Sequence, residues 1–227
     1  MNWTDISTDP NNINAILAMA EHLNGLAKTF TGEKLDLVRK YSFNKEVLDI
    51  GASGHNPAEE LNEWPHERIR QVAASVTGID IDGQSCDLYK GLGYQFICMD
   101  ATSDEFLGRT FDFIYGGDII EHVNDPVALL RFINRHLRTG GQCLISTPNP
   151  YFSGFRQLCK NRGEYFYTPN LQHISWIVPA NLMEILRRCG TLTLSDIYVP
   201  VTATQLANKQ HGTLEEYFHE YIYVIRK

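Results

Sequence analysis

The sequence lacks the features that mark a membrane or secreted protein. Its 227 residues contain no continuous apolar run of about 18 residues, the length that a membrane-spanning helix needs, so no membrane insertion is expected. The first residues form neither a basic nor an apolar segment, so no secretory signal is expected. Cysteine is scarce, with five scattered residues and no Cys-x-x-Cys pair. We therefore expect free thiols, a cytoplasmic location and no metal site.

Basic charge is also in short supply. The chain has 27 acidic and 20 basic residues, which gives a formal charge of −7. A negatively charged surface disfavours broad contact with phosphate backbones, so nucleic acid is not expected as a partner. Apolar residues make up 43% and charged residues 21% of the chain, the balance of a folded globular protein. The sequence does not indicate an oligomeric state.

Strand-like and helix-like segments alternate along the chain. The most clearly bounded helix begins at Pro126, because Asp125 is a suitable N-cap and Gly140 follows its end. This alternation predicts an α/β fold with a mainly parallel sheet and helices on both faces. Expected strands are 46–50, 75–80, 94–99, 111–115, 142–146, 191–199 and 221–226, and expected helices are 13–28, 33–41, 57–64, 65–74, 84–91, 126–137 and 179–189.

Small and acidic residues follow the first two strong strands. The segment Asp49-Ile50-Gly51-Ala52-Ser53-Gly54-His55 leads from a strand into a turn of small side chains, which lets a ligand approach the backbone. Asp80, followed by Ile81, ends the next strand. A carboxylate at that position accepts two hydrogen bonds from a ribose diol or caps a helix.

The next two strands end in a similar way. Met99-Asp100-Ala101 offers a carboxylate for an exocyclic amine and a thioether for the face of a flat ring. Gly116-Gly117-Asp118 opens a turn that leads into Glu121-His122-Val123. Ligands of parallel α/β sheets bind beyond the carboxyl ends of the strands, so these segments predict one binding site.

In this order the four motifs resemble those of the class I S-adenosylmethionine (SAM) dependent methyltransferases, in particular the small-molecule branch. The resemblance covers Glu46 to Ser146 well and the remainder to Lys227 weakly. It implies a Rossmann-like fold with a seven-stranded, mostly parallel sheet whose last strand is antiparallel. It further implies a single methyltransferase domain over 1–227, with N-terminal helices at 11–41, a cofactor-binding core at 46–146 and a substrate-lid insertion at about 147–176.

The resemblance implies SAM as cofactor and S-adenosyl-L-homocysteine (SAH) as product. Ser53 and His55 stand where the family's first loop has its second and third glycines. The resemblance assigns Gly51, Ala52 and Ser53 to the methionine part, Asp80 to the ribose, Asp100 with Ala101 beside it to the adenine amine, and Gly117 and Asp118 to the turn beneath the methionine and sulfonium. Asp49, Ile81 and Met99 are expected in the same cofactor site, and His122 is expected as scaffolding of the cofactor pocket.

The segment 147–176 predicts how the acceptor is bound. It is rich in aromatic residues and carries Arg156, Lys160 and Arg162 against the single acid Glu164. A lid of this composition favours a ring-bearing or anionic small molecule, although an aromatic mini-core under a loop explains the same residues. His173 is the candidate catalytic base that removes a proton from an acceptor hydroxyl, and a purely structural histidine is the alternative.

We therefore expect methyl transfer to a hydroxyl of a sugar, a glycolipid precursor or a secondary metabolite. Three alternatives stay open. A nicotinamide-dependent dehydrogenase fits less well, because the spacing from Gly51 to Asp80 differs from its fingerprint. A non-catalytic SAM-binding regulator or scaffold would keep the same pocket. An RNA methyltransferase normally adds a basic module, which is not visible in this chain.

Overall fold

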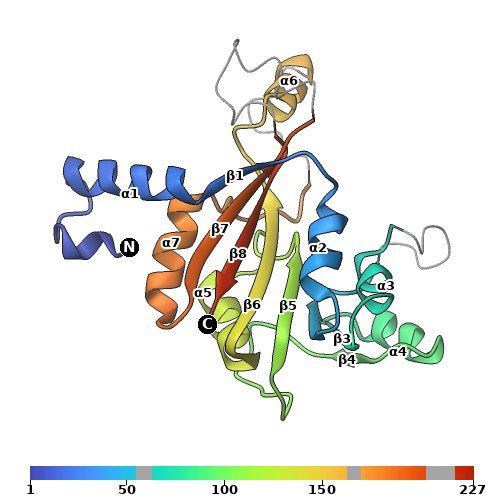
Figure 1. Cartoon of the computed structure of the whole chain (residues 1–227). Helices are drawn as coiled ribbons and strands as arrows, with labels where there is room; N and C mark the ends of the chain where they lie inside the picture. The colour runs from blue at the N-terminus through green and yellow to red at the C-terminus, as the bar shows by residue number, and fades with distance from the viewer. Residues whose placement is uncertain (55–62, 163–169, 203–217) are drawn as a thin grey trace.

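The computed structural model describes residues 1–54, 63–162, 170–202 and 218–227. They form an eight-stranded mixed sheet with helices on both faces (Figure 1). The strand order is β1-β7-β8-β6-β5-β2-β3-β4. β8 runs antiparallel to β6 and β7, and all other neighbours are parallel. The strands are β1 (Ala27–Phe30), β2 (Glu46–Ile50), β3 (Ser75–Asp80), β4 (Phe96–Cys98), β5 (Phe111–Gly117), β6 (Leu137–Pro148), β7 (Thr193–Pro200) and β8 (Glu220–Arg226).

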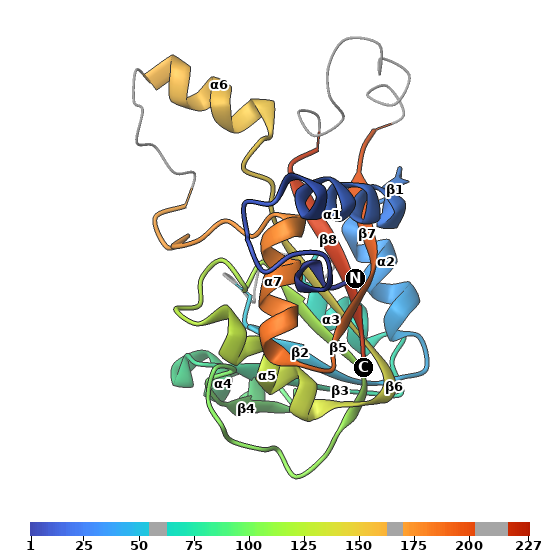
Figure 2. The ribbon, with the colours of Figure 1, turned by 90° about the vertical axis from the view of Figure 1, so that its left-hand side faces the viewer.

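Two large apolar cores lie on opposite faces of the sheet. Successive strand residues point to opposite faces, so Leu48 packs in the core that holds α5 and α7, and Val47 packs in the core that holds α2 and α3. Figure 2 shows α7 and α1 in front of the sheet. The helices are η1 (Trp3–Asp5), α1 (Ile13–Leu26), α2 (Lys34–Ser42), α3 (Pro65–Arg70), α4 (Gly83–Gly91), α5 (Pro126–His136), α6 (Ser153–Arg162) and α7 (Pro179–Cys189).

The sheet has eight strands, whereas the sequence predicted seven. The additional strand is β1, which continues from α1 and pairs in parallel with β7. The sequence predicted helix as far as Lys28, but α1 ends at Leu26. The first three residues of β1 are exposed, so the strand has no alternating apolar pattern by which to identify it. Its backbone instead occupies the edge of β7, whose N–H and C=O groups would otherwise be unpaired.

Most other predicted elements agree with the structure to within a few residues. The Asp125 carboxylate accepts hydrogen bonds from the backbone N–H groups of Val127 and Ala128, which confirms the predicted N-cap of α5. The helix predicted over 65–74 ends at Arg70, and the helix predicted over 57–64 lies mostly outside the described residues. Among the described residues, no helix combines the length and apolar character that crossing a membrane requires.

The parallel strands β4, β3, β2 and β5 lie side by side in that order and end at one edge of the sheet. The four loops that carry the sequence motifs leave from this edge. The fold therefore brings segments from four separate parts of the chain to a common place.

Candidate functional site

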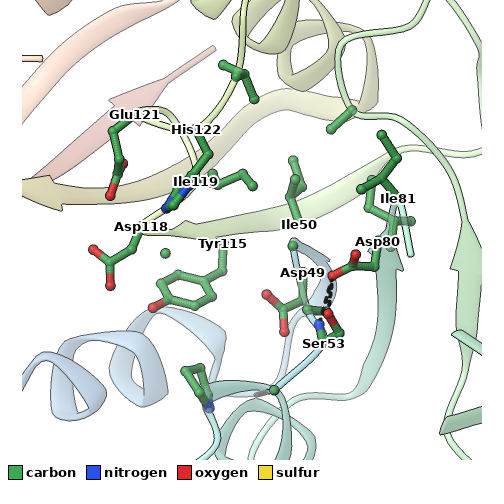
Figure 3. A pocket seen from close by; sticks show the side chains of 18 of the residues that line it. Asp49, Ile50, Ser53, Asp80, Ile81, Tyr115, Asp118, Ile119, Glu121 and His122 are labelled. Carbon is green, nitrogen blue, oxygen red and sulfur yellow. Dashed lines mark hydrogen bonds between the residues drawn. The ribbon is translucent and has the colours of Figure 1, made fainter. Parts of the chain in front are cut away.

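A cavity of about 1140 Å³ opens at this edge of the sheet (Figure 3). Pockets for a drug-sized ligand typically measure about 300–1000 Å³, so the cavity has room for a cofactor and a second molecule. Every residue that the sequence assigned to the cofactor, and the candidate base His173, lies on its wall: Asp49, Gly51, Ala52, Ser53, Asp80, Ile81, Met99, Asp100, Ala101, Gly117, Asp118, His122 and His173.

The loop after β2 passes close to the turn after β5. Gly51 has φ +66°, a conformation that glycine adopts without strain, and a Cβ built at this position would lie 3.0 Å from the Ile119 Cδ1 atom. The Gly51 and Ala52 N–H groups donate to the Ile79 carbonyl at 2.9 and 3.1 Å. The loop therefore forms a narrow floor of backbone and small side chains.

Asp80 ties this loop to the end of β3. Its Oδ2 atom accepts from the Ser53 N–H at 3.1 Å and from the Ser53 hydroxyl at 2.5 Å, while Oδ1 accepts from the Asp82 N–H at 3.0 Å. The carboxylate at the ribose position thus also organises the loop at the methionine position. The neighbouring Asp82 has a different role, because its side chain caps the N-terminus of α4.

Asp100 shapes the turn after β4. Its Oδ1 atom accepts hydrogen bonds from both the N–H and the hydroxyl of Thr102, each at 2.7 Å. Asp100 is exposed, and Met99 beside it is half-buried. An exposed carboxylate next to a polarizable thioether can bind the amine edge and the face of a purine.

A buried pair supports the loop from below. His66 Nδ1 and Asp49 Oδ2 lie 2.9 Å apart, and both side chains are almost fully buried. Burial raises the pKa of Asp49, and the bond to His66 acts against that rise. The Trp64 indole N–H donates to the Ala52 carbonyl at 2.9 Å. The sequence predicted helices here but neither of these contacts, because their partners are 12 and 17 residues apart in the chain and meet only in the fold.

The turn after β5 carries a network of charged groups. Asp118 has φ +51°, and its carboxylate receives the Lys34 ammonium at 2.7 Å and the Ser146 hydroxyl at 2.9 Å. Lys34 also pairs with Glu220 at 2.8 Å. Burial disfavours the ionised form of Asp118, but the ammonium outweighs it and holds the pKa of this carboxyl below its usual value. Lys34 and Glu220 are two functional candidates that the sequence missed, since they come from distant parts of the chain.

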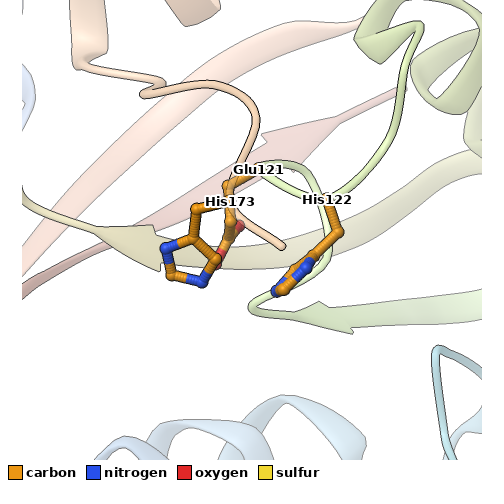
Figure 4. Close-up of side chains that lie close together, drawn as sticks. All are labelled: Glu121, His122 and His173. Carbon is orange, nitrogen blue, oxygen red and sulfur yellow. The ribbon is translucent and has the colours of Figure 1, made fainter. Parts of the chain in front are cut away.

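Glu121, His122 and His173 meet on the cavity wall (Figure 4). The Glu121 side chain is 1% exposed and that of His173 is 8% exposed, with 3.8 Å between Glu121 Oε1 and His173 Nε2. Burial raises the pKa of Glu121 to about 7. The backbone of the following loop is held here as well, because the N–H groups of Ile174 and Ser175 donate to the Glu121 carbonyl. Glu121 belongs to the Glu-His-Val motif, but the sequence assigned it no role.

The segment 147–176, which the sequence predicted to bind the acceptor, lies only partly within the described residues. α6 extends away from the sheet (Figure 2), and Phe155 at its beginning lines the cavity. Arg156 and Lys160 are exposed on this helix. Asn149 is buried and donates through its side-chain amide to the Phe218 carbonyl, which agrees with a structural role for the Thr147–Tyr151 segment. Outside the described residues lie Tyr165, Phe166, Tyr167 and the side chain of Arg162.

Comparison with known proteins agrees with the resemblance of the sequence motifs to methyltransferases. A family model described as "Methyltransferase domain" matches residues 19–193. The solved structure of magnesium protoporphyrin IX methyltransferase from Synechocystis PCC 6803 with bound SAH has a TM-score of 0.57 and 16% identity, and the alignment covers 99% of this chain and 93% of that one. At that identity the likeness concerns the fold.

Curated relatives match at low identity. A ubiquinone biosynthesis O-methyltransferase from Idiomarina loihiensis is 30% identical over 115 residues, which cover 47% of this chain and 44% of the relative. A tRNA U34 carboxymethyltransferase from Aliarcobacter butzleri is 26% identical over 194 residues, which cover 83% of this chain and 62% of the relative. The chain thus spans less than half of the first relative and less than two thirds of the second.

Proposed function

The chain belongs to the class I SAM-dependent methyltransferase family, and from this premise we propose that it transfers a methyl group from SAM to a hydroxyl of a small molecule. A sugar, a glycolipid precursor or a secondary metabolite is the acceptor class. The observation that carries the proposal is the position of Asp80 and Asp100, which follow adjacent parallel strands and line the same cavity as the Gly51 loop.

The chemistry of the cavity residues fits the cofactor. Asp80 and Ile81 would hold the ribose, and Met99, Asp100 and Ala101 the adenine. Asp49 supports the loop Gly51 to Ser53, which would lie along the methionine part, and Gly117, Asp118 and His122 would lie beneath it. Glycine at position 51 favours this assignment for two reasons. The residue has a positive φ, and a side chain there would press against Ile119 and narrow the floor of the cavity.

SAM, when bound, supplies a methyl carbon attached to a sulfonium, a leaving group that needs no further activation. The chain's own residues contribute alignment and exclusion of water. His173 is proposed as the base that removes the proton from the acceptor hydroxyl, since it lines the cavity beside Glu121 and His122. The segment 147–176 is proposed as the lid over the acceptor, with Phe155 on the cavity wall.

RNA is the second candidate acceptor, since the relative from Aliarcobacter butzleri is named for tRNA. The formal charge of −7 favours the small-molecule acceptor instead. The four cysteines with described side chains, Cys86, Cys98, Cys143 and Cys189, are free, which supports the proposed cytoplasmic location.

Calorimetry and methyl-transfer assays test the proposal together. We expect SAH to bind with one site per chain and NAD not to bind. Radiolabelled SAM should then label hydroxylated small molecules in an acceptor panel but not unmodified tRNA. NAD binding as tight as that of SAH would contradict the assignment, while labelled tRNA would establish the RNA acceptor. SAH binding without transfer to any acceptor would support the non-catalytic alternative.

A further inference from the structure

A second and smaller cavity lies apart from the cofactor cavity. Its volume is about 200 Å³, and the two cavities have no lining residue in common. Its wall includes Thr77 of β3, Ile97 of β4 and Phe111 of β5, together with Leu107 and Arg109 from the loop between β4 and β5. The methyltransferase assignment gives this cavity no role.

Arg109 is held at this cavity by two uncharged partners. Its Nη2 atom donates to the Thr77 hydroxyl at 3.1 Å, and its guanidinium carbon lies 4.6 Å from the centre of the Phe111 ring. No carboxylate of the described residues forms an ion pair with Arg109. A guanidinium that bonds only a neutral hydroxyl keeps its positive charge and most of its N–H donors available for an anion.

The Thr77 hydroxyl is a second donor that lacks an acceptor. Thr77 is only 5% exposed, and its oxygen accepts the hydrogen bond from Arg109, so its own O–H proton is still to be donated. Within the part of the chain that the structure describes, no group accepts that proton. A buried donor without an acceptor is unfavourable, so a ligand that brings acceptor oxygens satisfies Thr77 and Arg109 together.

We propose that this cavity binds a small organic monocarboxylate. Its carboxylate accepts hydrogen bonds from Arg109 and Thr77, and its apolar body packs against Ile97, Leu107 and Phe111. The inference goes beyond the methyl-transfer function and does not depend on it, because the two cavities are lined by different residues.

Charge and size select this class of ligand. One guanidinium compensates one negative charge, and its planar fork matches the two oxygens of a carboxylate. A phosphate ester carries about two negative charges at pH 7, which a single cation on a protein of net charge −7 compensates poorly. An apolar cavity of about 150 Å³ binds benzene, so about 200 Å³ has room for one ring or a short chain.

Benzoate is the probe, and it is titrated into the full chain labelled with ¹⁵N, with and without saturating SAH. We expect the backbone amide signals of Thr77, Ile97 and Arg109 to shift with a common dissociation constant. SAH should leave that constant unchanged, since it occupies the other cavity. Benzyl alcohol has the same ring without the charge, and it should bind roughly tenfold more weakly or less than that, because charge-assisted hydrogen bonds are lost.

Two substitutions separate the contributions of charge and hydroxyl. Arg109→Gln removes the charge and should weaken benzoate binding roughly tenfold or more, and Thr77→Val removes the hydroxyl and should weaken it by a smaller factor. Arg131→Gln is the matched control, because Arg131 is an exposed arginine of α5 that does not line the cavity, and it should bind like wild type. An unchanged Tm verifies that each variant is folded.

Three results overturn the site. The first is the absence of benzoate-dependent shifts at the three amides. The second is displacement of benzoate by SAH, which would place the compound in the cofactor cavity. The third is an equal loss of affinity in Arg109→Gln and Arg131→Gln. Equal affinity for benzyl alcohol and benzoate overturns the assignment to a carboxylate. None of these results depends on methyl transfer, so a failure of the proposed function is recognised separately.

Discussion

Single residues in the cavity serve two purposes at once. Asp80 lies at the proposed ribose position, yet in the structure it also accepts both hydrogen bonds of Ser53. Asp82, two residues further on, accepts from Gln84 and Ser85 at the beginning of α4 and does not line the cavity. The two neighbouring aspartates therefore have different contacts: Asp80 holds the Ser53 loop at the proposed ribose position, and Asp82 caps a helix.

Exchanging these two aspartates separately tests that division. Asp80→Asn keeps the size and one acceptor oxygen but removes the charge, and charge-assisted hydrogen bonds are worth about 1.5–3 kcal/mol. We expect SAH affinity to fall roughly tenfold or more by calorimetry. Asp82→Ala should lower the stability of the protein, as loss of an N-cap does, with SAH affinity intact. The reverse pattern would mean that Asp80 is a structural residue only.

At the scale of elements, the N-terminal segment is attached to α7 through one carboxylate. The Trp3 indole N–H donates to Glu184 Oε2 at 2.9 Å, and Arg187 and Arg188 pair with the same side chain at 2.7 and 2.9 Å. The bonds from Arg187 are the main reason that the pKa of Glu184 falls to about 2, against the opposing effect of burial and with help from Trp3 and Arg188.

This attachment predicts an acid dependence of stability. Because the folded pKa lies below the unfolded value of 4.5, the contribution of Glu184 is complete above about pH 4.5 and disappears as the pH falls towards 2. We expect Glu184→Gln to cost about 1 kcal/mol at pH 7 in urea denaturation and to lose less stability than wild type between pH 5 and pH 3. Parallel curves for the two proteins would show that the three partners contribute nothing.

Across the whole molecule, Lys34 connects the first part of the chain with the last strand. Its ammonium lies between Asp118 after β5 and Glu220 at the beginning of β8. Glu220 is only 8% exposed, whereas Asp118 is half-exposed and can be solvated. Removing the ammonium takes the lysine charge away from the buried Glu220 carboxylate and leaves the weaker contact with His219, whose Nε2 lies 3.3 Å from Glu220 Oε1.

Lys34→Met should therefore destabilise the protein by about 1–3 kcal/mol, less than a fully buried pair because water reaches Asp118. In a chain of this length that corresponds to a fall in Tm of roughly 2–12 °C. Lys40→Met on the exposed side of α2 is the control and should change Tm little. Adding Glu220→Gln to Lys34→Met should recover part of the loss, and an additive loss would contradict this account of Lys34.

The sequence by itself determined the order of most helices and strands and the motifs that follow the strands. Apolar periodicity encodes burial locally, and in a parallel sheet the carboxyl ends of adjacent strands share an edge, so Asp80, Asp100 and Gly51 were expected near one another. The N-cap of α5 is equally local, since Asp125 binds N–H groups two and three residues away.

Only the tertiary structure decided which distant residues complete the cavity. β1 has no apolar alternation and exists because the edge of β7 offers it partners. Lys34 and Glu220 share an ion pair, His66 supports Asp49, and His173 joins Glu121, each across a long stretch of chain. Such contacts depend on where loops and termini pack against the sheet. No local spacing records that packing, because the free energy that fixes it comes from burial of the whole chain.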